Sequence, residues 1–282
     1  MHSGLSSAAA LLPPELADAL GRLGGLERCE EIRLRCGRRP SARIDGQERP
    51  FHAERTGRRW LDYTLNAATR SSFHTYAGQL REGFVCTAEG VRVGVCGSAA
   101  DGAICAVRDV TGIAIRVPRQ VREAGAAAAE RIVAEGASAL IISPPGGGKT
   151  TFLRELIRRA SDAGRRVAAA DERGELAGEG FDLGRCTDVM SFMPKARAAV
   201  LMLRAMSPDI VAMDELTAPG DAEAALGCFG CGVGVYATAH AGSLEELRRR
   251  SVYRPLLECG AFGALVVISG VGAARRYEVQ RL

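Results

Sequence analysis

The stretch SPPGGGKTT, Ser143 to Thr151, decides the fold of this chain. A short apolar run precedes it at residues 137–143, and at residues 149–160 the apolar side chains recur at the spacing of one helical face. This succession of strand, glycine-rich loop, lysine, threonine and helix is the setting of a Walker A motif. The motif departs from its usual pattern at one position, because Ser143 stands where the pattern has glycine.

The composition of the loop is suited to binding phosphate groups. Gly146 to Gly148 let backbone N–H groups converge on phosphate oxygens without interference from a Cβ atom, and the start of the following helix adds its dipole. We expect Lys149 to neutralise the β- and γ-phosphates and the Thr150 hydroxyl to complete the ligand shell of Mg²⁺. The sequence therefore predicts ATP and Mg²⁺ as cofactors. The predicted nucleotide-binding residues of the loop are Ser143, Pro144, Pro145, Gly146, Gly147, Gly148, Lys149, Thr150 and Thr151.

The use of lysine supports this interpretation. Of the 37 basic residues in the chain, only Lys149 and Lys195 are lysine, and the others are arginine. A compact ammonium group fits between phosphates where a planar guanidinium does not, so a lysine retained in the loop indicates a functional requirement. The alternative is a glycine-rich turn that precedes a helix by chance. The sequence assigns no role to Lys195.

A second motif favours hydrolysis over binding alone. The apolar run Ile210 to Met213 is typical of a buried strand, and Asp214 and Glu215 follow at its end. Asp214 in that position can hold a water molecule bound to Mg²⁺, and Glu215 can orient and deprotonate the attacking water. We therefore predict Asp214, together with Thr150, as a metal ligand and Glu215 as a catalytic residue. The alternative is a strand exit that is merely acidic.

Three further side chains follow predicted strands and are candidates for the same sheet edge. His240 is predicted to sense the γ-phosphate, with a simple loop histidine as the alternative. Glu172 is a candidate for a second catalytic carboxylate that polarises the water or the metal, and a surface acid explains it nearly as well. Arg185, a dozen residues further on, is a candidate for nucleotide binding.

The order of predicted elements gives the fold class. In the second half of the chain, apolar runs alternate with helical segments, which predicts an α/β domain with a mainly parallel sheet covered on both sides. In the first half, residues 83–86 and 91–96 have the pattern of a hairpin. We predict a basic α+β domain over residues 1–120 and a P-loop domain over residues 121–282. The predicted strands are residues 31–35, 83–86, 91–96, 112–117, 137–143, 166–170, 210–213, 232–237 and 264–269, and a helix is expected within residues 119–136.

Bulk properties narrow the location and the partners. The net charge of +4 makes no general case for nucleic-acid binding, although eleven arginines against six acidic residues between Gly21 and Arg59 allow a positive face. Nine cysteines without a recognisable secretory signal favour a reducing cytoplasm. Cys228 and Cys231 are interpreted as two buried thiols, because zinc would need a second pair at comparable spacing. The uncharged residues 224–244 are interpreted as a helix that leads into a buried strand, not as a membrane span.

Several blocks of the sequence resemble known families. LRAMSPDIVAMDE (Leu203 to Glu215), DAEAAL (Asp221 to Leu226) and ATAH (Ala237 to His240) are similar to the Walker B region and histidine box of type II and type IV secretion ATPases, and DER (Asp171 to Arg173) falls at their acidic box. The chain resembles the stage III sporulation protein AA family more closely. The blocks that carry this resemblance are VAAADERGELAG (167–178), RCTDVMSFMPKA (185–196), LRAMSPDIVAMDEL (203–216), EIRLRCGRRP (31–40), REGFVCTAEGVRVGVCG (81–97) and TGIAIRVPR (111–119).

The resemblance implies a RecA-like ATPase domain over residues 121–282. It further implies a cytoplasmic protein of the mother cell, peripheral to the membrane through its partners, that powers or assembles the channel complex to the forespore. A homo-oligomer, expected to be a hexamer, would bind nucleotide between subunits, and the N-terminal domain would dock on membrane-embedded sporulation channel proteins. Leu216 to Pro219 depart from the Ile-Gly pair that usually follows the Walker B glutamate in this family.

Two other functions stay open on the sequence alone. One is a nucleic-acid-dependent P-loop ATPase whose arginine-rich N-terminal domain binds the track, but its single tryptophan and the lack of an aromatic stacking series give no firm evidence for nucleic acid. The other is a nucleotide-gated scaffold that binds ATP with little turnover. Stimulation by DNA or RNA and the steady-state rate of hydrolysis would separate these functions from the first.

Overall fold

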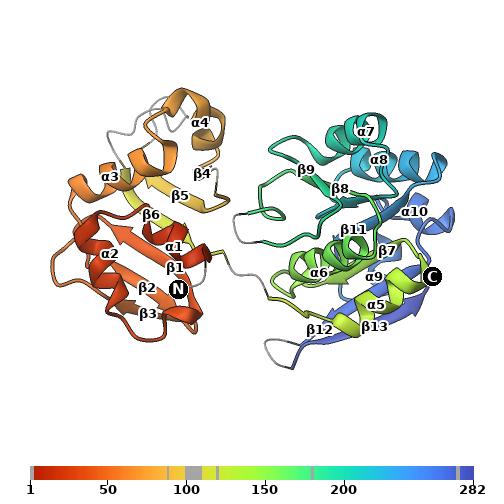
Figure 1. The fold of residues 1–282 in the computed structure, drawn as a ribbon, viewed down its shortest axis with the longest axis horizontal. Coiled ribbons are helices and arrows are strands. Elements are labelled where there is room, and N and C mark those ends of the chain that lie inside the picture. Colours follow the sequence, from red (N-terminus) through yellow and green to blue (C-terminus); the bar gives the residue numbers. More distant parts are fainter. Residues whose placement is uncertain (1–2, 88, 99–109, 119–120, 179–180, 271–273) are drawn as a thin grey trace. The chain divides into compact units, whose positions relative to one another are not determined.

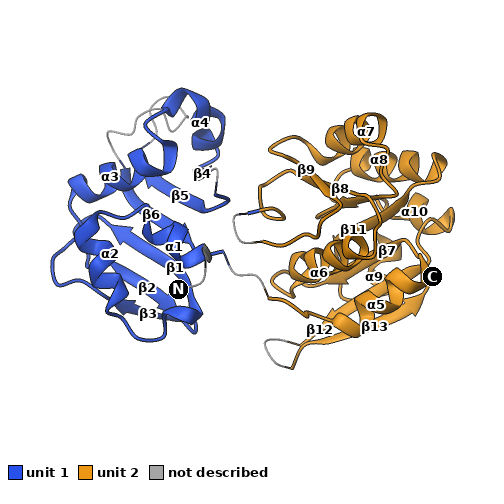
Figure 2. Ribbon diagram, in the orientation of Figure 1, with its two compact units in different colours: residues 1–119, 178–180 blue, residues 120–177, 181–282 orange. Residues whose placement is uncertain are grey.

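The computed structural model describes residues 3–87, 89–98, 110–118, 121–178, 181–270 and 274–282. The chain divides into two compact units (Figure 2). One comprises residues 1–119 with 178–180, and the other comprises residues 120–177 with 181–282. Each unit has a hydrophobic core of its own, and Figure 1 labels most of the helices and strands of both.

The N-terminal unit is built on a six-stranded antiparallel sheet in the order β3-β2-β1-β6-β5-β4. Side chains alternate along its strands, so Ile32 and Leu34 of β1 enter a core that they share with Leu16 and Leu61 from the helices. The predicted hairpin is present as β4 and β5, whereas β2 and β3 were not predicted. The elements are α1 (Ser3–Ala9), α2 (Pro14–Gly21), η1 (Leu26–Arg28), β1 (Cys29–Arg35), β2 (Ser41–Ile44), β3 (Gln47–Pro50), α3 (Arg58–Thr69), α4 (Phe73–Arg81), β4 (Phe84–Cys86), β5 (Arg92–Gly97) and β6 (Val110–Arg116).

Acidic side chains oppose many of the arginines in the basic stretch of this unit. Surface pairs of this kind contribute little to stability, but they lower the net positive charge of the region. The region between Gly21 and Arg59 is therefore a surface of mixed charge. The ion pairs are Arg28–Asp45, Arg33–Glu31, Arg35–Glu48, Arg43–Glu30 and Arg59–Glu15.

The C-terminal unit is built on a seven-stranded sheet in the order β13-β12-β7-β11-β10-β8-β9. Neighbouring strands from β12 to β9 are parallel, and β13 pairs antiparallel with β12 at the edge. The prediction of a mainly parallel α/β sheet is confirmed. The elements are α5 (Ala126–Glu135), β7 (Ala139–Ser143), α6 (Lys149–Asp162), β8 (Val167–Asp171), β9 (Thr187–Ser191), α7 (Lys195–Ala205), β10 (Ile210–Met213), α8 (Pro219–Gly230), β11 (Gly234–His240), α9 (Leu244–Arg249), α10 (Arg254–Glu258), β12 (Ala264–Ser269) and β13 (Arg276–Arg281).

Helices cover both faces of this sheet. Leu140 and Ile142 of β7 enter a core with α7 and α8, whereas Ala139 and Ile141 enter a second core with α5 and α6. A strand buried on both faces is apolar throughout, as β7 is. Because α6 begins directly after the glycine-rich loop, its packing fixes the loop at the sheet edge. The face of α6 predicted from its spacing is fully buried and consists of Phe152, Leu153, Leu156, Ile157 and Ala160.

The uncharged residues 224–244 include the end of α8 and the whole of β11, as the sequence predicts. In the described parts of the chain, none of the helices is long and apolar enough to cross a membrane. Cys228 is buried, and this burial raises the pKa of its thiol to about 11. The expectation of a second buried thiol is wrong, because Cys231 lies exposed just after α8 ends.

Candidate functional site

The glycine-rich loop joins the end of β7 to the start of α6. Gly146 (φ 74°) and Gly148 (φ 97°) have left-handed backbone conformations, which glycine adopts without strain. Position 147 has no room for a larger side chain, because a Cβ atom there would lie 2.2 Å from the hydroxyl oxygen of Ser143. The first N–H groups of α6 have no partners inside the helix, so they are directed at whatever the loop encloses.

Ser143, which replaces the usual first glycine, is fully buried at the end of β7. Its hydroxyl group donates to the backbone carbonyl of Pro144 (2.8 Å), so the burial leaves no hydroxyl unsatisfied. The backbone carbonyl of Ser143 accepts from the ammonium group of Lys149 (3.3 Å). The loop therefore tolerates a serine at this position, because both the hydroxyl and the carbonyl of Ser143 have hydrogen-bond partners.

Lys149, the first residue of α6, contacts His240, the last residue of β11. The lysine is buried, and its Nζ lies 2.9 Å from Nδ1 of His240. Burial lowers the pKa of Lys149, and the charges of Glu215 and Asp214 oppose this effect. The Cα of His240 is paired in register with that of Ser143, because β11 lies beside β7. The structure thus brings His240 to the loop.

Asp214 lies directly after β10 and accepts hydrogen bonds from two hydroxyl groups. Thr150, at the start of α6, donates to Oδ2 (2.7 Å), and Thr238 of β11 donates to Oδ1 (2.5 Å). A hydroxyl and a carboxylate are oxygen ligands of the kind that Mg²⁺ takes together with water and phosphate oxygens. The donor set of Thr150 and Asp214 therefore fits a magnesium ion beside the loop.

Glu215, the residue after Asp214, lies between the imidazole of His240 and the guanidinium of Arg173. Its Oε1 is 3.1 Å from Nε2 of His240, and its Oε2 accepts from Arg173 (2.7 Å). Burial alone would raise the pKa of Glu215, but Arg173, His240 and Lys149 outweigh burial and hold the pKa below its usual value. The carboxylate is therefore ionised at neutral pH, and a continuous polar chain runs from Lys149 through His240 and Glu215 to Arg173.

The end of β8 and the turn after it carry two further carboxylates. Asp171 is buried, which raises its pKa, and it accepts from two backbone N–H groups of its own turn (2.8 and 2.9 Å). The Oε2 of Glu172 lies 2.6 Å from Nζ of Lys195. Glu172 is therefore near the predicted site and already paired. These side chains enclose a small hollow, lined by Asp171, Glu172, Arg173, Glu175, Lys195, Asp214 and Glu215.

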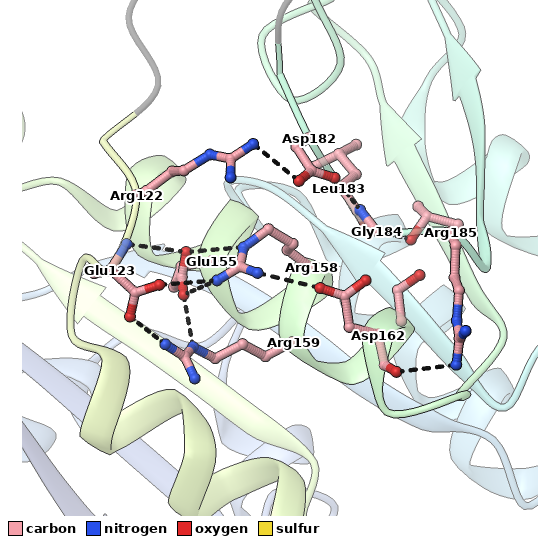
Figure 3. A network of polar contacts seen from close by, with 12 residues as sticks. Arg122, Glu123, Glu155, Arg158, Arg159, Asp162, Asp182, Leu183, Gly184 and Arg185 are labelled. Carbon is pink, nitrogen blue, oxygen red and sulfur yellow. Dashed lines mark hydrogen bonds and ion pairs between the residues drawn. The ribbon is translucent and has the colours of Figure 1, made fainter.

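The structure does not bring Arg185 to the loop. Its guanidinium donates to the backbone carbonyl of Asp162 (3.4 Å), the last residue of α6 (Figure 3). An α-helix rises about 1.5 Å per residue, so the length of α6 separates Arg185 from Lys149 by roughly 20 Å. The reason is topological. Because β9 runs parallel to β8, the residues before β9 lie at the amino ends of the parallel strands. The residues after β8 lie at the carboxyl ends, where the glycine-rich loop is.

The outer side of α6 is held by a separate charged network (Figure 3). The carboxylate of Glu155 is almost fully buried and accepts from Arg158 (2.6 Å) and Arg159 (2.6 Å). The backbone N–H of Glu123 also donates to it (3.3 Å). This network fastens the segment before α5 to the helix that carries Lys149 and Thr150. None of its side chains belongs to the hollow beside Glu215.

Several residues of the site were not among the predicted site residues, and Thr238, Arg173 and Lys195 make the contacts that matter most. Thr238, which binds Asp214, was detectable, because it lies two residues before His240 on a strand and so faces the same side. Arg173 and Lys195 bind Glu215 and Glu172 through side-chain contacts between distant segments. The pattern of residues along the chain carries no signal for such contacts.

A family model described as sporulation stage III, protein AA matches residues 19–278. The chain belongs to this family. The stage III sporulation protein AA of Bacillus subtilis (strain 168) is 29% identical over 281 residues, which cover 94% of this chain and 91% of that protein. The uncharacterised protein ycf45 of Porphyra purpurea is 26% identical, over 96% of this chain and 46% of its own length. The family predicted from the sequence blocks is thereby confirmed.

Solved structures with a similar fold include an ATPase and a pilus retraction motor. The ATPase DotB of Legionella pneumophila superposes with a TM-score of 0.65 at 18% identity, over 95% of this chain and 80% of its own. The pilus retraction motor PilT, solved with bound ADP, gives a TM-score of 0.67 at 17% identity, over 95% and 82%. At such low identity the likeness concerns the fold. The predicted RecA-like fold class of this family member is confirmed.

Proposed function

We propose that the protein binds ATP and Mg²⁺ at the loop between β7 and α6 and hydrolyses ATP to ADP and phosphate. The observation that carries this proposal is the convergence of three chemical roles on one sheet edge. A phosphate loop with its lysine, a hydroxyl–carboxylate pair for a metal, and an ionised carboxylate beside both lie within one network of contacts. The contacts are Lys149–His240 (2.9 Å), Thr150–Asp214 (2.7 Å) and His240–Glu215 (3.1 Å).

Each residue in this network has a distinct role. The amides of the loop and Lys149 bind the phosphates, and Thr150 and Asp214 hold Mg²⁺, which when bound neutralises charge on the phosphate oxygens. Glu215 orients the attacking water and accepts its proton, for which an ionised carboxylate is required. His240 lies between Lys149 and Glu215 and contacts both. When Lys149 binds the γ-phosphate it gives up its contact with His240, and in this way His240 responds to the γ-phosphate.

The wider role rests on the family and on the fold. We infer that the chain is the motor of a secretion-like channel complex between mother cell and forespore, on the cytoplasmic side and attached to the membrane through channel proteins. Membership of a sporulation family and likeness to DotB and PilT, which are an ATPase and a pilus retraction motor, support this inference. A homo-hexamer with nucleotide between subunits is the assembly that we propose.

Steady-state hydrolysis by the purified full chain tests the proposed activity. We expect Mg²⁺-dependent turnover that is unaffected by added DNA or RNA. Tight ATP binding with no turnover at any protein concentration would instead make the chain a nucleotide-gated scaffold. Turnover that rises on addition of nucleic acid and falls steeply with salt would make it a nucleic-acid-dependent motor.

A further inference from the structure

Lys195 occupies a position where a lysine is unfavourable unless specific contacts hold it. It is the first residue of α7, and the N-terminal end of a helix repels positive charge. It is also buried, with a relative exposure of 8%. In a chain with only two lysines, the other of which is in the phosphate loop, such a residue requires an explanation.

Two carboxylates from different segments hold its ammonium group. The Oε2 of Glu172 lies 2.6 Å from Nζ, and the Oδ2 of Asp221 lies 3.5 Å from it. Glu172 belongs to the turn after β8, and Asp221 belongs to the first turn of α8. Lys195 therefore connects three segments that are far apart in the sequence.

The contact with Asp221 reaches the segment that follows Glu215. The same Oδ2 of Asp221 accepts from the backbone N–H of Thr217 (2.9 Å) and of Ala218 (3.0 Å). Glu215 itself has a left-handed backbone (φ 52°), which a non-glycine residue adopts only when its surroundings hold it. The position of Thr217 and Ala218 is part of what holds it.

The contact with Glu172 reaches Glu215 from the other side. Glu172 is followed directly by Arg173, whose guanidinium binds Oε2 of Glu215 (2.7 Å). A shift of this turn would move Arg173 away from Glu215. Lys195 is thus linked to Glu215 by two routes, one through the backbone after it and one through the side chain that pairs with it.

We propose that Lys195 is a positioning residue that fixes Glu215 for water activation and keeps Glu172 paired, so that Glu172 does not act as the base. This inference rests on the proposed ATP hydrolysis. A lysine serves here because a compact ammonium can lie between two carboxylates in a buried space, whereas a planar guanidinium with five donors needs more room and more partners.

The test compares two full-length variants that each remove one cation from a charged network. Lys195→Met keeps an unbranched side chain, one heavy atom shorter, and removes its charge. Arg158→Met likewise replaces a cation with an unbranched apolar side chain, in the network on the outer side of α6, where Arg158 binds the buried Glu155. We expect Lys195→Met to lower kcat at least about tenfold with KM within about threefold, because a displaced catalytic group costs rate more than binding. Arg158→Met should keep kcat within about twofold.

Hydrogen exchange of the full chain gives a readout that does not depend on turnover. In Lys195→Met, the amides of Thr217 and Ala218 should exchange at least about tenfold faster than in the wild type, and in Arg158→Met they should not. If the wild type binds ATP but shows no turnover, the proposed hydrolysis fails, and the exchange experiment still decides the role of Lys195.

A second variant separates positioning from general stability. Lys195→Arg keeps the positive charge but replaces the compact ammonium with a planar guanidinium. We expect its thermal unfolding temperature to be closer to that of the wild type than to that of Lys195→Met. Its kcat should nevertheless remain low. The proposal is overturned if Lys195→Met keeps both its kcat and the slow exchange of Thr217 and Ala218. It is also overturned if Arg158→Met loses as much kcat as Lys195→Met.

Discussion

At the scale of single residues, Glu215 shows most clearly how structure and chemistry are connected. Its left-handed backbone (φ 52°) turns the chain sharply after Asp214, so that two consecutive carboxylates face different partners. Its N–H donates to the hydroxyl of Thr238 (2.8 Å), and the next N–H, of Leu216, donates to the carbonyl of the same residue (2.8 Å). These bonds compensate for a conformation that costs of the order of 1 kcal/mol or more in a non-glycine residue.

The first prediction concerns the base. Glu215→Gln keeps the shape of the side chain but removes its proton affinity, so the variant should bind ATP–Mg²⁺ with affinity close to that of the wild type and lose at least about two orders of magnitude in turnover. Steady-state hydrolysis and a direct binding titration measure the two quantities. Glu172→Gln removes the carboxylate but keeps an oxygen that can accept from Lys195, so this matched control should keep most of the turnover. The opposite pattern would transfer the role of base to Glu172.

The second prediction concerns pH. Glu215 must be ionised to accept a proton, and its lowered pKa keeps it ionised at pH values where an ordinary glutamate is protonated, so the acid limb of kcat/KM that belongs to it should lie below the usual range for a glutamate. Arg173→Ala removes the main charge that opposes the effect of burial, so the pKa of Glu215 should rise and the limb should move to higher pH. Arg131→Ala, in a surface ion pair of α5, is the control. Identical limbs in Arg173→Ala and the wild type would mean that Arg173 does not influence the base.

At the scale of elements, the shape of the glycine-rich loop depends on Ser143, the buried residue at the end of β7. Ser143 fills the space that a Cβ atom on Gly147 would need, and the two positions are therefore coupled. The serine in place of the usual glycine is compatible with the loop because Gly147 is present and because the hydroxyl has a partner in Pro144.

The third prediction tests this coupling. Gly147→Ala should weaken ATP–Mg²⁺ binding at least about tenfold, because the new methyl group overlaps the Ser143 side chain and displaces the loop. The double variant Ser143→Gly with Gly147→Ala removes the overlapping atoms and should recover most of the lost affinity in a binding titration. Additive losses in the double variant would contradict the coupling.

In the C-terminal unit, the strands predicted from the sequence are those whose residues are mostly buried. β7, β8, β10, β11 and β12 are apolar runs in the interior of a parallel sheet, so their composition alone marks them. Of the strands that the sequence does not reveal, β3, β9 and β13 are edge strands, and β2 lies beside β3. β13 (Arg276–Arg281) and β9 (Thr187–Ser191) have few fully apolar positions, and β2 and β3 are four residues long. Their pairing is set by neighbouring strands and not by their own composition.

The same contrast holds for the site. Asp214 and Glu215 follow β10 and His240 ends β11, so all three lie beside the loop, where the carboxyl ends of the parallel strands meet. Arg185 was expected near the loop from its position in the chain. It precedes β9, a parallel strand that was not predicted, so it lies at the amino ends of the strands, away from the loop. Lys195 received no role because its two partners lie 23 and 26 residues away in the sequence, and only the fold brings them together.

At the scale of the whole molecule, the chain consists of two units with separate cores, and its likeness to DotB and PilT spans both. We proposed that nucleotide lies between the subunits of a homo-hexamer. In such an assembly, a neighbouring subunit completes the site, so that activity depends on assembly as well as on the residues of one chain.

The fourth prediction follows from that dependence. The turnover per chain should rise with protein concentration until the oligomer is saturated, and light scattering of Glu215→Gln with ATP–Mg²⁺ should give about six times the 29.8 kDa mass of one chain. Turnover per chain that stays constant at concentrations where the protein is monomeric would contradict a site shared between subunits.

The most direct measurement is an experimental structure of the full chain with Mg²⁺ and a non-hydrolysable ATP analogue. The account predicts that the β- and γ-phosphates lie against the amides of Gly146 to Gly148 and Lys149, that Thr150 and Asp214 face the metal, and that Glu215 lies within hydrogen-bond distance of a water beside the γ-phosphate. An analogue bound elsewhere, or Asp214 and Glu215 turned away from its phosphates, would contradict the account.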